Sequence, residues 1–144
     1  MKGRLLIVDD EPEIRDMLYR HFRLLGYEVS TAGNGLEALA VLREKRMDAV
    51  ISDIQMPEMD GVSLLREIRR QYPMIRVIMI TGHVTLENAL ACMRNQADTC
   101  VFKPLTDMGE LEDAVHTAMA ALARWNRKFR ELKGLKPGEA GELP

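Results

Sequence analysis

The sequence predicts an α/β protein with a doubly wound, five-stranded parallel sheet of strand order 2-1-3-4-5. Two observations predict this fold. Short apolar runs rich in β-branched residues alternate with longer stretches of helical periodicity along the chain. Polar residues, several of them acidic, follow these runs directly, as loops at one edge of a parallel sheet would. Because crossovers between parallel strands are right-handed, few strand orders are allowed, and this one places the first and third strands side by side.

The first half of the chain contains two strand–helix units. Residues 5–8 form the first predicted strand. Pro12 suits the first turn of the next helix, where the missing N–H of proline has no helical partner anyway. Residues 27–32 form the second strand, and Asn34 and Glu37 have the spacing of a capping box. The inward face predicted for the second helix consists of Leu36, Leu39, Ala40 and Val41.

The second half contains three further units. Residues 49–51 form a short, mostly β-branched run that indicates a strand buried on both faces. The fourth and fifth strands are expected at residues 75–80 and 99–102. Helices are predicted after these three strands from Val62, through Leu86, Leu90 and Met93, and from Thr106 or Asp107.

Length and composition indicate one globular domain. The chain has 144 residues, of which 47% are hydrophobic and 29% charged, with a net charge of -2. This charge does not favour nucleic-acid binding, and no apolar run approaches the ~20 residues that span a bilayer. Cys92 and Cys100 lack metal-ligand spacing and suit a reducing compartment. We therefore expect a cytoplasmic protein.

Four strand ends carry the residues most suited to chemistry. Asp9 and Asp10 follow the first strand, Asp53 the third, Thr81 the fourth and Lys103 the fifth. Three carboxylates close together raise each other's pKa unless a cation joins them. Mg²⁺ suits such a place, because it takes a few oxygen ligands and keeps its other positions for water or phosphate. An acidic pair alone is more often a helix N-terminus, so the joint placement carries the metal-site hypothesis.

Four motifs in this order resemble the signature of bacterial response-regulator receiver domains. They are Val8-Asp9-Asp10-Glu11, the stretch from Asp53 to Gly61, Ile80-Thr81-Gly82, and Phe102-Lys103-Pro104. The resemblance covers about residues 4–122 and implies a flavodoxin-like fold. It also implies a signalling switch of a two-component phosphorelay, which assists only its own phosphorylation and dephosphorylation.

The resemblance implies a phosphoacceptor and a magnesium site. Asp53 matches the residue that takes a phosphoryl group from a sensor histidine kinase or a histidine phosphotransfer protein. Asp10 and Asp53 match the side-chain ligands of Mg²⁺, the backbone carbonyl of Gln55 matches a third ligand, and Asp9 would act through water. Phosphoryl transfer mainly needs such positioning and neutralisation of charge.

The resemblance also covers the switch, with one departure. Lys103 matches the cation that pairs with the phosphoacceptor, and Thr81 matches the hydroxyl that moves to the phosphate. The family usually has Tyr or Phe where this chain has Cys100. Strand alternation puts Phe102 on the side of Cys100, so Phe102 is a candidate for the missing aromatic surface, although simple packing against a helix is an equal alternative. Gln55 and His83 resemble positions beside the route of a hydrolytic water, where family members tune phosphate lifetime, although a solvated or capping role is the alternative for His83.

Three other functions fit the sequence less well than the receiver interpretation does. Mg²⁺-dependent phosphatases with an aspartyl-phosphate intermediate usually carry a second Asp where this chain has Gln55. A flavin-binding domain of similar topology would need a phosphate loop where Asp9-Asp10-Glu11 would repel the phosphate. A degenerate receiver acting only as an interaction module is disfavoured because every site residue is present.

The last helix is predicted to continue beyond a minimal receiver. We expect a receiver domain at residues 1–123, a helical extension at 124–133 and a disordered tail at 134–144. Steps of four and three residues continue through Leu111, Val115, Ala118, Leu122, Trp125, Phe129 and Leu132. A homodimer contact, a linker to an unknown output domain, or folding back onto the domain could each use this stripe. The basic residues beside it are expected to form a solvated face.

Overall fold

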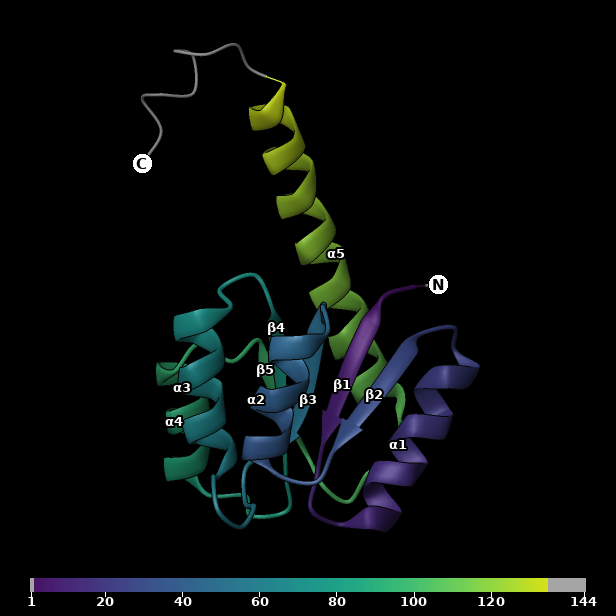
Figure 1. Cartoon of the computed structure of the whole chain (residues 1–144). Coiled ribbons are helices and arrows are strands. Elements are labelled where there is room, and N and C mark those ends of the chain that lie inside the picture. Colours follow the sequence, from purple (N-terminus) through teal and green to yellow (C-terminus); the bar gives the residue numbers. More distant parts are fainter. Residues whose placement is uncertain (1, 135–144) are drawn as a thin grey trace.

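The computed structural model describes residues 2–134, which form a five-stranded parallel sheet with helices on both faces (Figure 1). The strands lie in the predicted order β2-β1-β3-β4-β5. In chain order the elements are β1 (Arg4–Val8), α1 (Pro12–Leu24), β2 (Glu28–Ala32), α2 (Gly35–Glu44), β3 (Ala49–Asp53), α3 (Gly61–Gln71), β4 (Arg76–Thr81), α4 (Leu86–Arg94), β5 (Thr99–Phe102) and α5 (Gly109–Lys133). None of the helices in this described part combines the length and hydrophobicity needed to cross a bilayer.

The sheet separates two hydrophobic cores. On one face, strand side chains such as Val50 pack against Leu64 and Leu65 of α3. On the other, Ile51 lies in a cluster with Phe22 of α1 and Val115 of α5. β3 is buried along its whole length, as its β-branched sequence predicts. The central strands are therefore held rigidly from both sides, and so is the edge where they end.

α2 differs from its predicted face, and α4 buries little of its surface. Leu36 was predicted to face inward, but it is 51% exposed, because α2 buries Gly35, Ala38, Leu39 and Leu42 at ordinary helical spacing. α4 forms where the sequence predicts it, but Leu86 and Met93 are 76% and 67% exposed. Cys92 is the residue that α4 buries fully, which leaves this helix shallowly attached.

Side chains accept hydrogen bonds from backbone N–H groups at the N-termini of α2 and α5. The Asn34 side chain accepts a hydrogen bond from the Glu37 N–H, as predicted for a cap. The Glu37 carboxylate accepts from the N–H of Gly33 rather than from that of Asn34, so the second bond of a capping box lies one residue earlier. α5 begins at Gly109, later than Thr106 or Asp107, and an Asp107 carboxylate oxygen accepts from the Gly109 N–H.

The outer part of α5 stands clear of the domain (Figure 1). Leu111, Val115 and Ala118 are buried against the sheet, whereas Trp125 and Phe129 are 53% and 40% exposed. Folding back, one of the three expected uses, is not seen in the described residues. The predicted tail, 134–144, lies outside them except for Gly134.

Candidate functional site

Three polar side chains are buried where β1, β3 and β4 end. Asp53 is the last residue of β3, Thr81 the last of β4, and Asp9 follows β1. The register aligns Val8 with Ser52, so Asp9 emerges beside Asp53. Asp9, Asp53 and Thr81 are 0%, 5% and 1% exposed, respectively. Residues far apart in sequence thus meet at one edge because parallel strands all end there.

Lys103, directly after β5, joins the two buried carboxylates. Its Nζ donates hydrogen bonds to Oδ2 of Asp53 at 3.0 Å and to Oδ2 of Asp9 at 3.1 Å. Burial by itself would lower the pKa of Lys103, but the hydrogen bond with Asp53 and the charges of both carboxylates raise it overall. The ammonium therefore stays charged and neutralises part of the acidic cluster.

The acidic cluster has a surplus of negative charge beyond this lysine. Carboxylate oxygens of Asp9, Asp10, Glu11 and Asp53 all lie within 4.8 Å of one another. Burial raises the pKa of Asp9 above its ordinary value, although the Glu11 N–H and the Lys103 charge oppose this effect. Two buried and two exposed carboxylates around one ammonium fit a small hard cation, because such ions take oxygen ligands and keep several waters.

A pocket of about 580 Å³ opens over these groups. Its lining includes Asp10, Asp53, Gln55, Thr81, His83 and Lys103. The Thr81 hydroxyl turns toward its own loop, because it accepts from the His83 N–H at 3.0 Å and donates to the His83 carbonyl at 3.3 Å. The Gln55 N–H donates to Asp53 Oδ1 at 3.3 Å. The pocket is large enough for a tetrahedral anion beside Asp53, with hydroxyl and ammonium donors on its wall.

Gly61 holds the loop behind Asp53 in place. The Gly61 N–H donates to the Ile54 carbonyl at 2.7 Å. A Cβ at Gly61 would lie 2.1 Å from the Asp53 carbonyl oxygen, which is far inside contact distance. Since α3 begins at this glycine and Asp60 caps it by accepting from the Ser63 N–H, the helix start and the phosphoacceptor candidate are fixed together.

The residues singled out near β5 take different positions. Cys100 is partly buried and packs against the core that contains Cys92. A hydrogen bond with Cys92 and burial raise the pKa of the Cys100 thiol, which agrees with a packing role for this side chain. Phe102 is 47% exposed and pairs in register with Thr81. The aromatic ring is therefore at the surface beside the site.

Sequence reasoning missed Glu11 as a member of the site. Its carboxylate oxygen Oε1 lies 3.3 Å from Lys103 Nζ, and its N–H donates to Asp9 Oδ1 at 2.9 Å. The sequence carried a signal for this residue, because Glu11 directly follows Asp9 and Asp10. The 60% exposure of its side chain could not be inferred from the sequence. The structure brings Asp9, Asp10, Asp53, Gln55, Thr81, His83 and Lys103 together at the carboxyl edge of the sheet, whereas Cys100 packs in the core.

Comparisons with known proteins agree with this geometry. A family model described as "Response regulator receiver domain" matches residues 5–116. The regulatory protein AtoC of Escherichia coli K12 is 40% identical over 130 residues, which cover 90% of this chain but 28% of AtoC. This chain thus spans under a third of that relative's length.

Solved structures extend the likeness to three dimensions. A receiver domain protein described as CheY-like, from Methanospirillum hungatei, has a TM-score of 0.81 at 30% identity, over 85% of this chain and 97% of its own. The response regulator TrrA from Thermotoga maritima, solved in complex with Mg²⁺–BeF, has a TM-score of 0.73 at 35% identity, over 81% of this chain and 98% of its own. With the fold, the strand-end residues and the family model in agreement, the chain belongs to the response-regulator receiver domains of two-component signalling.

Proposed function

We propose that Asp53 accepts a phosphoryl group and that this charge change switches the surface around β4 and β5. The observation that carries the proposal is the buried Asp53 carboxylate, 3.0 Å from the Lys103 ammonium at the floor of an open polar pocket. A structural ion pair would need no such opening. A pocket lined by a hydroxyl, an ammonium and surplus carboxylates suits an anion that arrives with a metal ion.

The transfer is a displacement at phosphorus with a phosphohistidine as donor. An Asp53 carboxylate oxygen forms the new O–P bond while the P–N bond to the donor imidazole breaks. The electron pair of the broken bond stays on the imidazole nitrogen, which leaves as neutral imidazole once protonated. Lys103 is already placed to move its hydrogen bond from the Asp53 carboxylate to a phosphoryl oxygen, and the product is an aspartyl phosphate. The donor protein would be a sensor histidine kinase or a histidine phosphotransfer protein.

Magnesium fits the donor set of this pocket. The Asp10 and Asp53 carboxylates and the Gln55 carbonyl would hold it directly, and Asp9 would hold it through water. Bound Mg²⁺ supplies positive charge to the phosphoryl oxygens during transfer. The chain's own residues limit the number of ligands: Asp9 is already occupied by Lys103 and the Glu11 N–H, whereas Asp10 makes no such bond among the hydrogen bonds of the described residues.

The Thr81 hydroxyl is the first moving part of the proposed switch. In this structure it is bonded within its own loop, to the backbone of His83. A phosphoryl group on Asp53 offers stronger, charged acceptors, so Thr81 would exchange these bonds for one to phosphate and draw the loop inward. His83 would move with it, and with Gln55 it lines the approach of a hydrolytic water. We assign these two residues to the tuning of phosphate lifetime.

Phe102 is proposed as the aromatic readout in place of the residue replaced by Cys100. It is exposed and in register with Thr81, so movement of the β4 end alters its surroundings. Replacement of Phe102 by Ala should abolish phosphorylation-dependent association with a partner while leaving phosphorylation intact. If association survives in Phe102→Ala, this part of the proposal fails and Phe102 is a packing residue.

The experiment that tests the central proposal uses Mg²⁺ with phosphoramidate as a small phosphodonor. Intact-mass analysis should show one added phosphoryl group on the native protein and none on Asp53→Ala. Asp16→Ala is the matched control, because Asp16 is an exposed carboxylate on α1 and its loss should leave labelling unchanged. Labelling that persists in Asp53→Ala, or that is independent of Mg²⁺, contradicts the proposal. A Mg²⁺-dependent phosphatase would instead turn over a phosphate-ester substrate, which we do not expect with Gln55 in place of a second Asp.

A further inference from the structure

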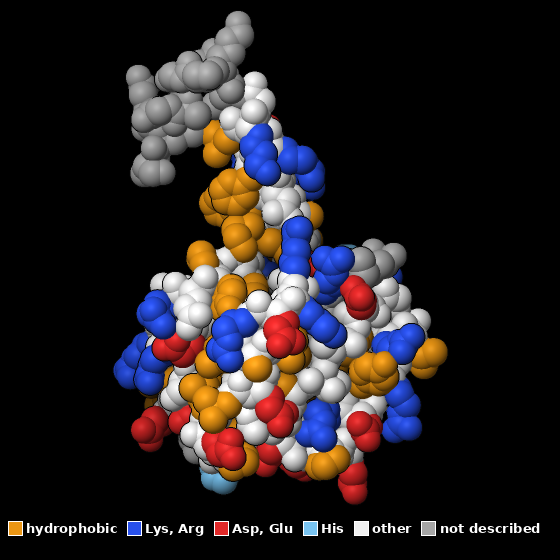
Figure 2. Space-filling view, in the orientation of Figure 1, with side chains coloured by type: hydrophobic (Ala, Val, Ile, Leu, Met, Phe, Trp, Pro, Cys, Tyr) orange, Lys and Arg blue, Asp and Glu red, His pale blue; other side chains and the backbone are white. Residues whose placement is uncertain are grey.

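The outer part of α5 carries an apolar stripe that nothing in the site uses. The stripe, called here the seam, consists of Leu122, Trp125, Phe129 and Leu132. Its steps of three and four residues place all four on one side of the helix. Trp125 and Phe129 stack at 6.0 Å between ring centroids, and Trp125, Phe129 and Leu132 are 53%, 40% and 37% exposed. Figure 2 shows this hydrophobic group standing out from the projecting helix.

The seam runs down into a second pocket. This pocket, of about 520 Å³, lies at the amino edge of the sheet and is lined by Leu122 and Asn126 of α5 together with Tyr72 and Met74. Since Leu122 belongs to both, the pocket and the seam form one surface. Its length is roughly 15 Å along the helix, from ten residues at ~1.5 Å each, plus the pocket. This is enough for about three turns of a partner helix.

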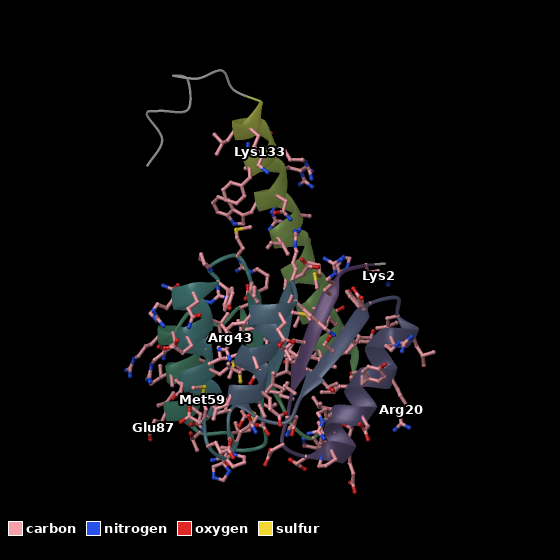
Figure 3. All side chains as sticks on the ribbon, viewed as in Figure 1. Lys2, Arg20, Arg43, Met59, Glu87 and Lys133 are labelled. Carbon is pink, nitrogen blue, oxygen red and sulfur yellow. The ribbon has the colours of Figure 1, made fainter. Side chains whose placement is uncertain are left out.

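Basic residues border both the pocket and the seam. A group called here the basic collar, Arg43, Lys45 and Arg46, is exposed and lines the pocket, where it outnumbers the acidic residues Glu44 and Asp48. On the helix, the seam is flanked by Lys128 and Lys133. Residues 124–133 contain five basic residues and one acid, Glu131, which forms an exposed ion pair with Lys128 at 3.5 Å. Arg43 and Lys133, labelled in Figure 3, mark the collar and the outer end of α5. The opposite edge of the sheet is the acidic cluster.

This charge distribution disfavours a second copy as the occupant. In a parallel pair with heptad packing, Lys128 would face Lys133 of the second copy across the seam. In an antiparallel pair, the outer end of one α5 would lie beside the basic collar of the other. Both arrangements bring like charges together, which is destabilising at the edge of a helical interface.

A bilayer is also a poor match for the seam. Helices that lie in the membrane interface have a broad apolar face. Here the apolar residues form the narrow stripe of a coiled-coil contact, with lysines directly at its edges. The geometry is that of a helix-in-groove contact in which the partner supplies both apolar anchors and negative charge.

We propose that the seam, the pocket at its base and the basic collar bind an acidic amphipathic helix of a different protein. The apolar residues of that helix would follow heptad spacing and would be flanked by Asp or Glu. Its anchors would cover Trp125 and Phe129, one apolar side chain would enter the pocket beside Leu122, and its carboxylates would pair with Lys128, Lys133 and the collar. This contact is independent of the proposed phosphorylation and would persist without Mg²⁺.

The test uses the full chain and two designed helical peptides with the same leucine seam, one flanked by Glu and the other by Lys. Trp125 is the single tryptophan of the chain, so its fluorescence reports directly on the seam. The Glu-flanked peptide should give a saturable blue shift that weakens with salt, and the Lys-flanked peptide should bind at least about tenfold more weakly. Equal binding of the two peptides, or no binding of the Glu-flanked one, overturns the proposal.

Charge-reversal variants locate the contact. Lys128→Glu with Lys133→Glu should weaken binding of the Glu-flanked peptide by about tenfold or more and strengthen binding of the Lys-flanked peptide. Arg20→Glu with Arg94→Glu makes the same charge change at exposed positions on α1 and α4, outside the seam, its pocket and the collar, and should alter binding much less. Phe129→Ser is a second variant, which removes an aromatic side chain of the seam without changing charge. It should weaken binding of both peptides.

Sedimentation and binding assays test whether a second copy of the chain, a lipid surface or DNA binds the seam instead. Native protein that forms dimers through the seam at micromolar concentration, and loses them in Phe129→Ser, overturns the proposal in favour of a second copy. A larger Trp125 blue shift with phosphatidylglycerol vesicles, or with duplex DNA, than with the Glu-flanked peptide overturns it in favour of those ligands. A monomer that responds only to the Glu-flanked peptide supports it.

Discussion

The two ends of this molecule are built in opposite ways. At the carboxyl edge of the sheet, charged groups from three loops meet, and Lys103 pairs with the buried carboxylates of Asp9 and Asp53. Beyond the amino edge, one continuous helix carries aromatic side chains that contact mainly each other. The first end is specified by tertiary structure and tolerates little change. The second is specified by local sequence alone, so substitutions there should leave stability nearly unchanged.

The strongest test of the rigid end is Gly61→Ala. Its Cβ would lie 2.1 Å from the Asp53 carbonyl oxygen and 2.8 Å from the Ile54 Cα, and both are backbone atoms that cannot rotate away. We expect a loss of about 3 kcal/mol in the free energy of unfolding, measured by urea denaturation. Gly82→Ala is the matched control, because its Cβ would come no closer than 3.8 Å to Lys103, and it should change stability by less than about 1 kcal/mol. Equal effects of the two substitutions would show that the loop behind Asp53 is not rigid.

Lys103→Ala should have the next largest effect. It leaves the carboxylates of Asp9 and Asp53 buried without their shared cation, at a cost of about 1–3 kcal/mol in the free energy of unfolding. The raised pKa of Lys103 means that its contribution is present at neutral pH and is lost only at strongly alkaline pH, as pH rises through the folded-state pKa.

Magnesium provides the internal check on Lys103→Ala. Since a cation that binds only the folded state stabilises it, added Mg²⁺ should restore part of the lost stability, and its stabilising effect should be larger in Lys103→Ala than in the native protein. Stability that falls without any gain from Mg²⁺ would mean that Lys103 acts through packing and not through charge.

Asp9→Asn should act in the opposite direction and more weakly. The pKa of Asp9 is raised in the folded state, mainly by burial, so the folded protein binds this proton more tightly than the unfolded chain does. The ionised carboxylate is therefore destabilising at neutral pH, and Asn should increase metal-free stability there. The gain should shrink as pH falls through the folded-state pKa of Asp9 toward the unfolded value of 3.8.

The pH dependence is what identifies the cause. Denaturation in EDTA at several pH values measures the difference between Asp9→Asn and the native protein. Asp16→Asn, an exposed carboxylate on α1, should show a nearly constant difference over the same range. A gain for Asp9→Asn that is independent of pH would assign it to altered packing.

The same contrast explains what could be predicted from the sequence. The strand order and the meeting of Asp9, Asp53 and Lys103 followed from alternating elements and from residues placed directly after strands, because parallel topology forces strand ends together. The inward placement of Leu36 was wrong, since which side of a helix meets the sheet depends on docking that periodicity alone does not fix. Bonds such as that between Thr81 and His83 depend on loop conformation, which short polar segments do not encode clearly.

The smallest expected effect belongs to the outer end of α5. Leu111→Ala and Leu132→Ala make the same chemical change in one helix, at residues that are 0% and 37% exposed. Leu111→Ala removes a buried side chain from the core and should cost about 2–5 kcal/mol. Leu132→Ala should stay within about 0.5 kcal/mol, because its side chain has no core to leave. Thermal denaturation of the two variants measures this ratio directly. If Leu132→Ala lowers the free energy of unfolding as much as Leu111→Ala does, the seam is already buried in the free protein, by self-association or by folding back. The outer end of α5 would then not be an independent, exposed helix.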